Sequence, residues 1–416
     1  MENKSQLNII IYETSNLIKG LHVSYCIYLV NIVWHMQYTN VDDVVVSAYQ
    51  LGHLYSFIVL KLLQFEGYKL VKNSKDIFMS FRDLHMEMKE DKDARWFELE
   101  CVPEDYIPLK ENRPQNLDSP VCDSIPVIDL AKPNGLVEEI LKGSQEFGFF
   151  QVINHGIPEK ILIDAMNVLK EFFDMQGKNA PTGTIPDKKG YIYTRSDFAD
   201  DGTNLWRENL KHPCHPLERC IHLWPDTPTR YQEVIATYLV EIQKLSSRIL
   251  EMIDEGLGLE QGHFKNTSEV QLLSSNFYPP CADPSLTLGL SPHFDTSLIS
   301  LVYQGGSPGL QFIKDGQWIN VGAIPNAFVV NIGNQLEIIS NKKLKSVQHR
   351  VVTSTHATRL SIATFVNPSL DCIIEPAKVL VNELEPSLYP TSQYKDYVQR
   401  TNAFGAYTAA ILNAMR

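Results

Sequence analysis

The chain has 416 residues, of which 44% are hydrophobic and 21% are charged, and its net charge at pH 7 is −12. Such a composition is typical of a soluble globular protein with enough sequence for two or three domains. No run of lysine and arginine is long enough to follow a phosphate backbone. This argues against nucleic acid as a partner and favours a small-molecule ligand.

The seven cysteines are an odd number, scattered along the chain without a Cys-x-x-Cys pair. This pattern argues against a disulfide framework and predicts a reducing compartment, by default the cytoplasm. We expect the protein to be a cytoplasmic monomer.

Residues 1–100 differ from the rest and are interpreted as an N-terminal extension of unknown role. Residues 20–41 and 44–60 contain no Lys, Arg, Asp or Glu, and each stretch is long enough for a membrane-spanning helix. Polar side chains interrupt both, which argues against spanning and leaves the membrane as a weaker alternative for residues 20–60. A secretory signal is not expected, because the N-terminus is not basic and no small-residue cleavage site follows. The next stretch, residues 102–120, is rich in proline and polar residues, as in an extended linker.

An N-terminal domain is predicted within residues 101–225. Its apolar pattern predicts short strands at 124–130 and 149–156. Apolar residues at helical spacing predict helices at 135–148 and 159–175. This part of the chain therefore mixes helix and strand and is rich in helix.

A stretch near the end of this domain, residues 212–222, contains five side chains of types that bind zinc. Their spacing matches no familiar zinc pattern, and Pro213 and Pro216 indicate a loop. We interpret the stretch as a surface connection. The five side chains are His212, Cys214, His215, Cys220 and His222.

A long supporting helix is predicted over residues 226–260. Thr227 is placed as its N-cap, Pro228 falls in the first turn, and Gly256 is placed to end it. Apolar residues recur between these limits at spacings of three and four, which is ordinary core packing.

From about residue 268 to 370 the pattern changes to short runs rich in β-branched and aromatic residues, separated by Gly, Pro, Asn and Asp. This pattern predicts a jelly roll. The fold class is therefore mixed α+β: a C-terminal double-stranded β-helix (jelly roll), a helix-rich N-terminal domain and a long supporting helix. Residues 371–416 form a C-terminal segment, and the helical spacing of 403–416 indicates a lid that could close over a site.

One predicted strand carries His293 and Asp295 two positions apart, and alternate side chains of a strand point to the same face. A jelly roll can bring a distant third ligand to them, and His349 lies in another predicted strand. Two histidines and one carboxylate match the facial triad of non-haem Fe(II) oxygenases, which leaves positions on the ion open. The spacing alone is weak evidence, because the chain has 12 histidines.

Further polar residues alternate along two other predicted strands. Arg359 and Ser361 share one strand face, and a guanidinium beside a hydroxyl can bind a carboxylate. Asn276 and Tyr278 share a face of the strand that precedes His293, and they add an amide and a phenol to the same pocket. The sequence thus predicts a metal site next to a carboxylate clamp.

Together these motifs resemble the plant Fe(II)- and 2-oxoglutarate-dependent dioxygenases. The resemblance covers about residues 102–395. Within the family, the stretches WRENLKHPCHPLE and LWPDTPTRYQEV are most similar to the branch that contains hyoscyamine 6-dioxygenase. The motifs that carry the resemblance are, in chain order, IPVIDL, FGFFQVINHG, NFYPPCADPSLTLGLSPHFD, GLQFIKDGQWINV, AFVVNIGNQL, KSVQHRVV and RLSIATFVNP.

The resemblance implies roles for the matching residues. His293, Asp295 and His349 would bind Fe(II), whereas Arg359 and Ser361 would hold the distal carboxylate of 2-oxoglutarate. It also implies dioxygen as cosubstrate and ascorbate as reductant. The implied reaction is hydroxylation, desaturation or epoxidation of a small specialised metabolite such as an alkaloid, flavonoid or phenolic, with release of succinate and carbon dioxide.

The resemblance assigns further residues to the pocket. Tyr278 would assist the clamp, and Asn276 would border the cosubstrate. Phe365 stands where the family often stacks an aromatic ring on a planar substrate, although a core aromatic is an equally good interpretation. Phe294 stands where a smaller residue is common, and Asn334 stands where an aspartate is frequent. Both differences could reshape the substrate pocket.

Two other histidines have plainer interpretations. We expect His155 to be structural and His356 to lie in a turn. Two alternatives to the dioxygenase remain open from the sequence: a non-catalytic jelly-roll protein that binds a metabolite, and an ascorbate-dependent oxidase of the same fold.

Overall fold

The computed structural model describes residues 100–114, 125–176, 184–186, 190–194, 202–265, 267–268 and 270–401. All of these residues belong to one compact unit, Lys92–Arg416. Within the described ranges, no helix combines the length and the apolar character that crossing a membrane requires. The expectations for the two uncharged N-terminal stretches lie outside the described residues.

The first helices and strands form where the sequence predicts them. The strands β1 (Val127–Asp129) and β2 (Phe149–Ile153) pair in parallel, and α6 (Leu136–Glu146) connects them. Gly135 precedes α6 in the left-handed conformation, with a φ of 81°, and two glutamates in the first turn suit the positive end of the helix dipole. Helix α7 (Glu159–Gln176) follows β2.

The long supporting helix is α9 (Tyr231–Leu257), and it begins later than predicted. Thr227 is not its N-cap, a place taken by Arg230. Pro228 lies in a turn before the helix, where its carbonyl accepts the N–H of Tyr231 at 2.8 Å. The prediction of the start was wrong because this turn satisfies the backbone before the helical repeat begins.

The predicted end of this helix was also wrong. Gly256 lies inside the last turn, where a side chain would collide with Leu141 of α6. The helix ends at Gly258, whose φ of 68° is the left-handed conformation favoured just after a helix. Gly256 therefore allows close packing of two helices, and Gly258 supplies the turn.

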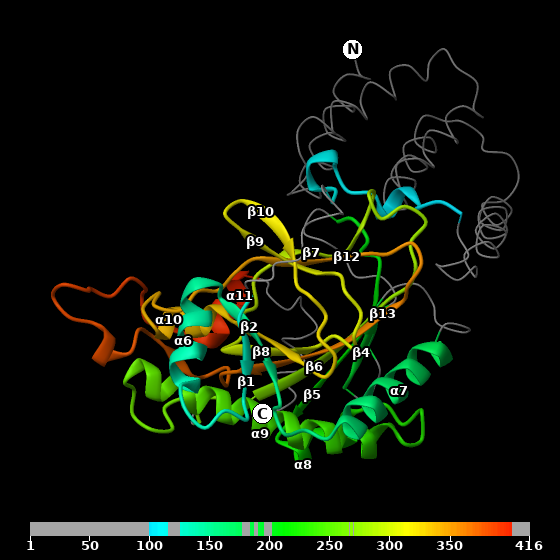
Figure 1. Cartoon of the computed structure of the whole chain (residues 1–416). Helices are drawn as coiled ribbons and strands as arrows, with labels where there is room; N and C mark the ends of the chain where they lie inside the picture. Colours follow the sequence, from blue (N-terminus) through cyan, green and yellow to red (C-terminus); the bar gives the residue numbers. More distant parts are fainter. Residues whose placement is uncertain are drawn as a thin grey trace, which may run out of the picture. The chain divides into compact units, whose positions relative to one another are not determined.

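The remaining strands form two sheets (Figure 1). The larger has nine strands in the order β1-β2-β11-β8-β13-β6-β5-β4-β3, and the smaller has the order β10-β9-β12-β7. The pairing is antiparallel except between β1 and β2. The bounds are β3 (Thr184–Pro186), β4 (Ile192–Thr194), β5 (Glu208–His215), β6 (Val270–Tyr278), β7 (Leu288–His293), β8 (Ile299–Tyr303), β9 (Leu310–Lys314), β10 (Gln317–Asn320), β11 (Phe328–Ile332), β12 (His349–Val352) and β13 (Arg359–Asn367).

These two sheets confirm the predicted fold class of mixed α+β with a double-stranded β-helix. The large sheet includes β3, β4 and β5 as well as the later strands, so it combines strands of both predicted domains. A two-stranded sheet, β14 (Ile373–Ile374) with β15 (Ser392–Gln393), lies in the C-terminal segment. The other helices are α8 (Leu217–Cys220), α10 (Asn334–Ile339) and α11 (Tyr394–Thr401).

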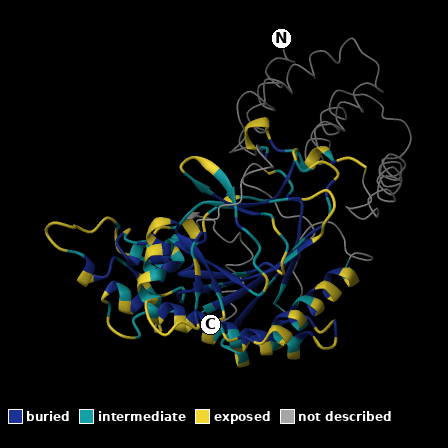
Figure 2. Ribbon diagram, viewed as in Figure 1, coloured by how far each residue is buried: buried dark blue, intermediate teal, exposed yellow. Residues whose placement is uncertain are grey.

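The two largest apolar clusters of the core lie one on each side of the large sheet. The larger cluster lies between the sheet and helices α6, α7 and α9, and the smaller cluster lies between the two sheets. Figure 2 shows these strands and the inner sides of the helices as buried. Strand β11 contributes to both: Phe328 and Val330 pack toward the helices, whereas Val329 packs between the sheets. Any residue of β11 that lies an even number of positions from Val329 therefore faces the inside of the jelly roll.

The His- and Cys-rich stretch is not a surface connection, so that prediction was wrong. Its first half is β5, which lies between β4 and β6 in the large sheet. His212, Cys214 and Cys220 are buried. The strand tolerates Pro213 because the pairing with β6 shifts register between Pro213 and His215. No cluster of three or more metal-binding side chains among the described residues includes this stretch.

We predict that His212 makes folding stability depend on pH. Burial lowers its pKa to about 4, and its ring contacts the Tyr231 hydroxyl at 2.8 Å. Between pH 6.5 and 4 the unfolded chain therefore binds a proton that the folded protein does not, and stability falls as the pH falls through this window. The expected loss between pH 7 and 5 is about 2 kcal/mol. Urea unfolding of metal-free protein should show a smaller loss in His212→Phe, and an unchanged loss would contradict the assignment.

The predicted linker is only partly an extended connection. Val102 is buried against Trp206 and Cys281, and the Tyr106 ring meets Trp206 edge-on at 5.2 Å. The Asp105 carbonyl also accepts the N–H of Asn204 at 2.9 Å. The prolines made this stretch resemble a linker, but its apolar residues pack on the jelly roll. Residues 115–124 lie outside the described residues.

Candidate metal and cosubstrate site

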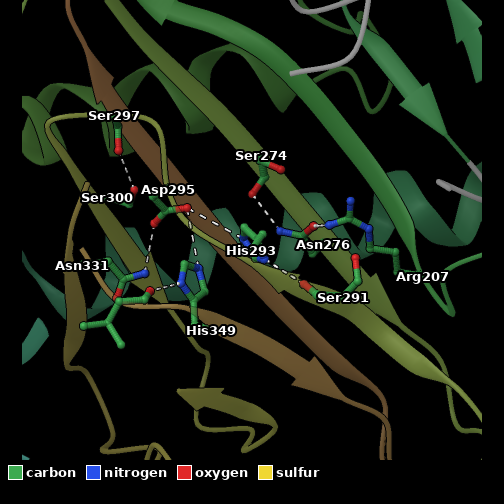
Figure 3. Close-up of polar contacts among 11 residues, drawn as sticks. Arg207, Ser274, Asn276, Ser291, His293, Asp295, Ser297, Ser300, Asn331 and His349 are labelled. Atoms are coloured by element: carbon green, nitrogen blue, oxygen red, sulfur yellow. Dashed lines mark hydrogen bonds and ion pairs between the residues drawn. The ribbon is translucent and has the colours of Figure 1, made fainter. Parts of the chain in front are cut away.

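Two strand ends and the loop after one of them bring together the two histidines and the aspartate. Strand β7 ends at His293, β12 begins at His349, and these two residues are direct partners in the antiparallel pairing of the small sheet. Asp295 lies two residues beyond the end of β7, in the connection to β8. It therefore reaches the histidines from a loop, and not from the strand itself as predicted. Figure 3 shows the three side chains pointing toward one another.

The distances within this triad suit a single metal ion. Oδ1 of Asp295 lies 3.8 Å from Nε2 of His293 and 3.6 Å from Nε2 of His349. The two ring centroids are 4.2 Å apart. One ligand atom from each residue lies within 4.8 Å of the others, and no second such cluster is found in the part of the chain that the structure describes.

The other ring nitrogen of each histidine has a backbone partner. Nδ1 of His293 lies 2.9 Å from the Ser291 carbonyl, and Nδ1 of His349 lies 3.2 Å from the Val347 carbonyl. A carbonyl can only accept, so each Nδ1 carries a proton, and each Nε2 is the nitrogen that faces Asp295 and can bind a metal ion. This arrangement of an oriented imidazole is common at metal sites.

The electrostatics of His293 and Asp295 favour the forms that bind a metal ion. Burial lowers the pKa of His293 to about 3, with a further contribution from His349 that outweighs the attraction of Asp295. Burial opposes ionisation of Asp295, but the neighbouring His349 and His293 hold its pKa below the usual value. A neutral imidazole and an ionised carboxylate are the forms that bind a metal ion, so the donor set fits one.

Sequence reasoning missed two residues behind the carboxylate. Asn331 of β11 donates a hydrogen bond from Nδ2 to Oδ2 of Asp295 at 3.2 Å. The Ser300 hydroxyl of β8 also contacts Asp295 and helps to lower its pKa, and it lies 3.0 Å from the Ser297 hydroxyl. A polar residue at an inward position of an otherwise apolar strand was the available signal for Asn331.

Helix α10 supports the loop that carries Asp295. The Asn334 N–H donates to the Asp295 carbonyl at 2.8 Å, and the Gly333 N–H donates to the Leu298 carbonyl at 2.8 Å. The helix approaches so closely that a methyl group at Gly333 would overlap the Ser297 carbonyl oxygen. Gly333 is therefore needed for space, because its φ of −91° is accessible to any residue.

Gly333→Ala is expected to push α10 away from this loop. Two backbone segments meet there, and neither can relieve the overlap by changing a rotamer. Overpacking of this kind costs about 1–3 kcal/mol of folding stability. Thermal unfolding should show the loss, and titration with Mn(II) should show weaker binding because the Asp295 loop moves. A variant with normal stability and normal Mn(II) affinity would refute this role.

The predicted clamp residues lie where β6 ends and β13 begins. Arg359 begins β13 and Tyr278 ends β6, and they are direct strand partners, as are Ser361 and Asn276. Nη1 of Arg359 donates to the Ser361 hydroxyl at 2.8 Å, and its guanidinium lies 5.2 Å from the centre of the Tyr278 ring. The predicted sharing of one face by these residues is therefore present in the structure.

Arg359 is a buried cation without an acidic partner among the described residues. It is 5% exposed, and it contacts Ser361, Tyr278 and the Gln304 side chain, which accepts from Nη2 at 3.3 Å. Its Nε has no hydrogen-bond partner there, and burial lowers its pKa. A buried guanidinium of this kind fits an anionic ligand. It also borders a cavity of about 410 Å³ at this end of the barrel.

Asn276 lies between the clamp and the metal triad, within a buried polar network. Its Oδ1 accepts from Nη1 of Arg207 at 2.8 Å and from Nδ2 of Asn209 at 3.0 Å. Asn209 also donates to the Ser274 hydroxyl at 2.8 Å. In Figure 3, Asn276 and Arg207 are nearer to His293 than to the other two members of the triad. The sequence did not identify Arg207 or Asn209 as part of the site.

The two predicted pocket aromatics occupy different surroundings. Phe365 lies an even number of residues after Arg359 on β13, so the two side chains point to the same face of the strand. Its strand partner is Ser300, whose hydroxyl contacts the Asp295 carboxylate. It packs with Ile192 and Leu272 in a small apolar cluster. Phe294, between two members of the triad, is 46% exposed. Both therefore lie at the end of the barrel where the triad is located.

His155, His356 and Asn334 were also considered in the sequence, and none of them belongs to the triad. His155 has a structural role, because its Nε2 contacts the Asn326 carbonyl at 2.7 Å and its ring packs on Phe328. His356 is exposed in a bend and does not join the triad. Asn334 donates from Nδ2 to the Tyr397 hydroxyl of α11 at 2.7 Å. The predicted lid at residues 403–416 lies outside the described residues.

Fold and site together define a jelly-roll protein with a triad that suits one divalent metal ion and a buried arginine that suits an anionic ligand. Comparison with known proteins agrees: residues 269–368 match the 2OG-Fe(II) oxygenase superfamily, and residues 125–227 match the N-terminal part of the non-haem dioxygenases of morphine synthesis. The chain belongs to this 2OG-Fe(II) oxygenase superfamily, and it is an Fe(II)- and 2-oxoglutarate-dependent dioxygenase.

Individual relatives cover most of the chain. Hyoscyamine 6-dioxygenase of Hyoscyamus niger is 42% identical over 312 residues, which are 71% of this chain and 90% of that protein. Flavanone 3-dioxygenase 2 of Oryza sativa subsp. japonica is 35% identical over 309 residues, 72% of this chain and 90% of that protein. The crystal structure of JOX2 in complex with 2OG, Fe and JA has a TM-score of 0.65 and 33% identity, covering 73% of this chain and 90% of that one.

Proposed function

We propose that His293, Asp295 and His349 hold the Fe(II), and that Arg359 and Ser361 bind the distal carboxylate of 2-oxoglutarate. The observation that carries this proposal is the pairing of an oriented metal-binding triad with a buried arginine that lacks an acidic partner among the described residues. With 2-oxoglutarate and dioxygen, bound Fe(II) supplies oxidation of an unactivated C–H bond, while 2-oxoglutarate becomes succinate and carbon dioxide.

The protein contributes position and shielding to this reaction. The Ser291 and Val347 carbonyls accept the Nδ1 protons of His293 and His349, and this fixes both rings with Nε2 aimed at one point. Asp295 stays ionised. Arg359 fixes the far end of the cosubstrate, with Tyr278 against its guanidinium and Asn276 along the way to the triad. The apolar residues between the sheets exclude water from this path.

We propose a small specialised metabolite as the substrate, such as an alkaloid, flavonoid or phenolic. Two observations support it: the named substrates of the relatives from Hyoscyamus niger and rice, and the position of Phe365 and Phe294 at the triad end of the barrel. Aromatic rings there would pack on the flat or apolar part of such a molecule. Hydroxylation, desaturation and epoxidation all remain within this proposal. We further propose that the protein is a monomer in the cytoplasm, where reduced cysteines are stable.

Turnover tests the proposal directly. Purified full-length protein with Fe(II), ascorbate and 2-oxoglutarate should form succinate slowly without substrate and faster with it. Extract from the source tissue, treated with the wild type and with Asp295→Ala, should differ by the product of oxidation. Turnover that continues without 2-oxoglutarate would favour an ascorbate-dependent oxidase, and metabolite binding without any turnover would favour a non-catalytic protein. Either result would overturn the proposal.

A further inference from the structure

Asn331 occupies an unusual place for an amide side chain. It lies on β11, where Phe328, Val330 and Ile332 pack toward the helices and Asn331 faces inward. Its strand partners are Phe149 of β2 and Ser300 of β8. The residue is 7% exposed. A buried amide requires hydrogen-bond partners, so its contacts are informative about why it is there.

The partner of Asn331 is one particular oxygen of Asp295. Its Nδ2 donates to Oδ2 at 3.2 Å, whereas the histidine Nε2 atoms lie nearest to the other oxygen, Oδ1, at 3.6 and 3.8 Å. The Ser300 hydroxyl is a second polar contact of the same carboxylate. In Figure 3 the dashed line from Asn331 ends on one oxygen of the Asp295 carboxylate, and the lines from the two imidazoles end on the other. The two oxygens therefore have separate environments.

We infer that Asn331 is a positioning residue that keeps Asp295 a ligand through one oxygen only. The inference rests on the proposed function of the triad. Two imidazoles and one oxygen leave three places on a six-coordinate ion, whereas a carboxylate that used both oxygens would leave two. A cosubstrate that binds through two atoms and dioxygen together need three. By holding Oδ2, Asn331 thus preserves the place that dioxygen requires.

Asn331→Leu tests the inference, because leucine has a similar volume and no donor. Gln151→Leu is the matched control: Gln151 is a buried amide on β2, paired with Val329 of β11 and away from Asp295. Mn(II) is the probe. Its affinity is measured by titration, and the water bound to it is measured by water-proton relaxation in the absence of 2-oxoglutarate. Circular dichroism and thermal unfolding confirm the fold, and Asn331→Ala replaces Asn331→Leu if leucine prevents folding.

The wild type and Gln151→Leu should show the relaxation expected for three exchangeable waters on Mn(II). Asn331→Leu should show about one third less water-proton relaxation per bound ion. Its Mn(II) affinity should change by about 10- to 100-fold, as it does when other hydrogen-bond partners of metal ligands are removed. Turnover should fall through kcat, with the KM for 2-oxoglutarate little changed. If the variant matches the wild type in relaxation and in affinity, the inference fails. If the wild type itself binds no Mn(II), the proposed function of the triad fails instead.

Discussion

Asp295→Ala is expected to abolish metal binding and turnover. The carboxylate is the single anionic member of the triad, and both imidazoles are oriented toward its Oδ1. Loss of an outer partner of a metal ligand already costs about 10- to 100-fold in affinity, so loss of the ligand itself should cost more. Titration with Fe(II) under anaerobic conditions, or with Mn(II), measures the effect, and succinate formation should stop.

Thermal unfolding separates this loss from misfolding. A ligand at a concentration of 100 times its dissociation constant stabilises the folded protein by about 2.7 kcal/mol. We therefore expect added metal to raise the Tm of the wild type and to leave the Tm of Asp295→Ala unchanged. Asp174→Ala, which removes an exposed carboxylate paired with Lys170 on α7, should behave as the wild type. A normal metal-induced increase in Asp295→Ala would place the metal elsewhere.

The second large effect is expected for Arg359→Met. This change removes the buried guanidinium while keeping an apolar chain of similar length, so the affinity for 2-oxoglutarate should fall by about 2–3 kcal/mol, or roughly 30- to 150-fold. Mn(II) affinity should be unchanged, because Arg359 is not one of the three candidate metal ligands. Isothermal titration with each ligand, and the KM for 2-oxoglutarate, measure the two effects separately.

The folding stability of the ligand-free protein distinguishes loss of the clamp from misfolding, because a misfolded variant would be less stable than the wild type. Arg359 is buried without an acidic partner among the described residues, and methionine would remove the cost of burying its charge. Arg359→Met should therefore be as stable as the wild type or more stable. Arg350→Met is the control: Arg350 is also buried, but it bonds Gln311 at 2.8 Å and lies over Trp318. If both variants lose 2-oxoglutarate affinity equally, the assignment of the clamp is wrong.

The structure differs from the sequence predictions mostly where distant segments meet. The prolines of residues 213 and 216 indicated a loop, but pairing with β6 makes residues 212–215 part of a buried strand, and α8 follows Pro216. Glycine is typical of a helix end, yet Gly256 lies inside α9, because any larger side chain there would collide with Leu141. Local composition records what a segment prefers by itself, and tertiary packing overrides it where apolar surface is buried.

Within the site, the residues found from sequence are those with a local pattern. Arg359 with Ser361, and Asn276 with Tyr278, alternate along single strands, and this two-residue repeat is visible in the chain itself. Asn331, Ser300 and Gln304 were missed, because single amides and hydroxyls in strands have many ordinary roles. Their relation to Asp295 or Arg359 exists only across strands.

The sequence by itself determined the fold class, the two-residue alternation of polar side chains and the chemical identity of the three candidate metal ligands. The tertiary structure decided which oxygen of Asp295 faces the histidines, which nitrogen of each imidazole is free, and that Arg359 is buried apart from any acid among the described residues. The physical reason is that alternation follows from the covalent geometry of one strand. Register and spacing between strands depend instead on hydrogen bonds and apolar packing among segments far apart in the chain.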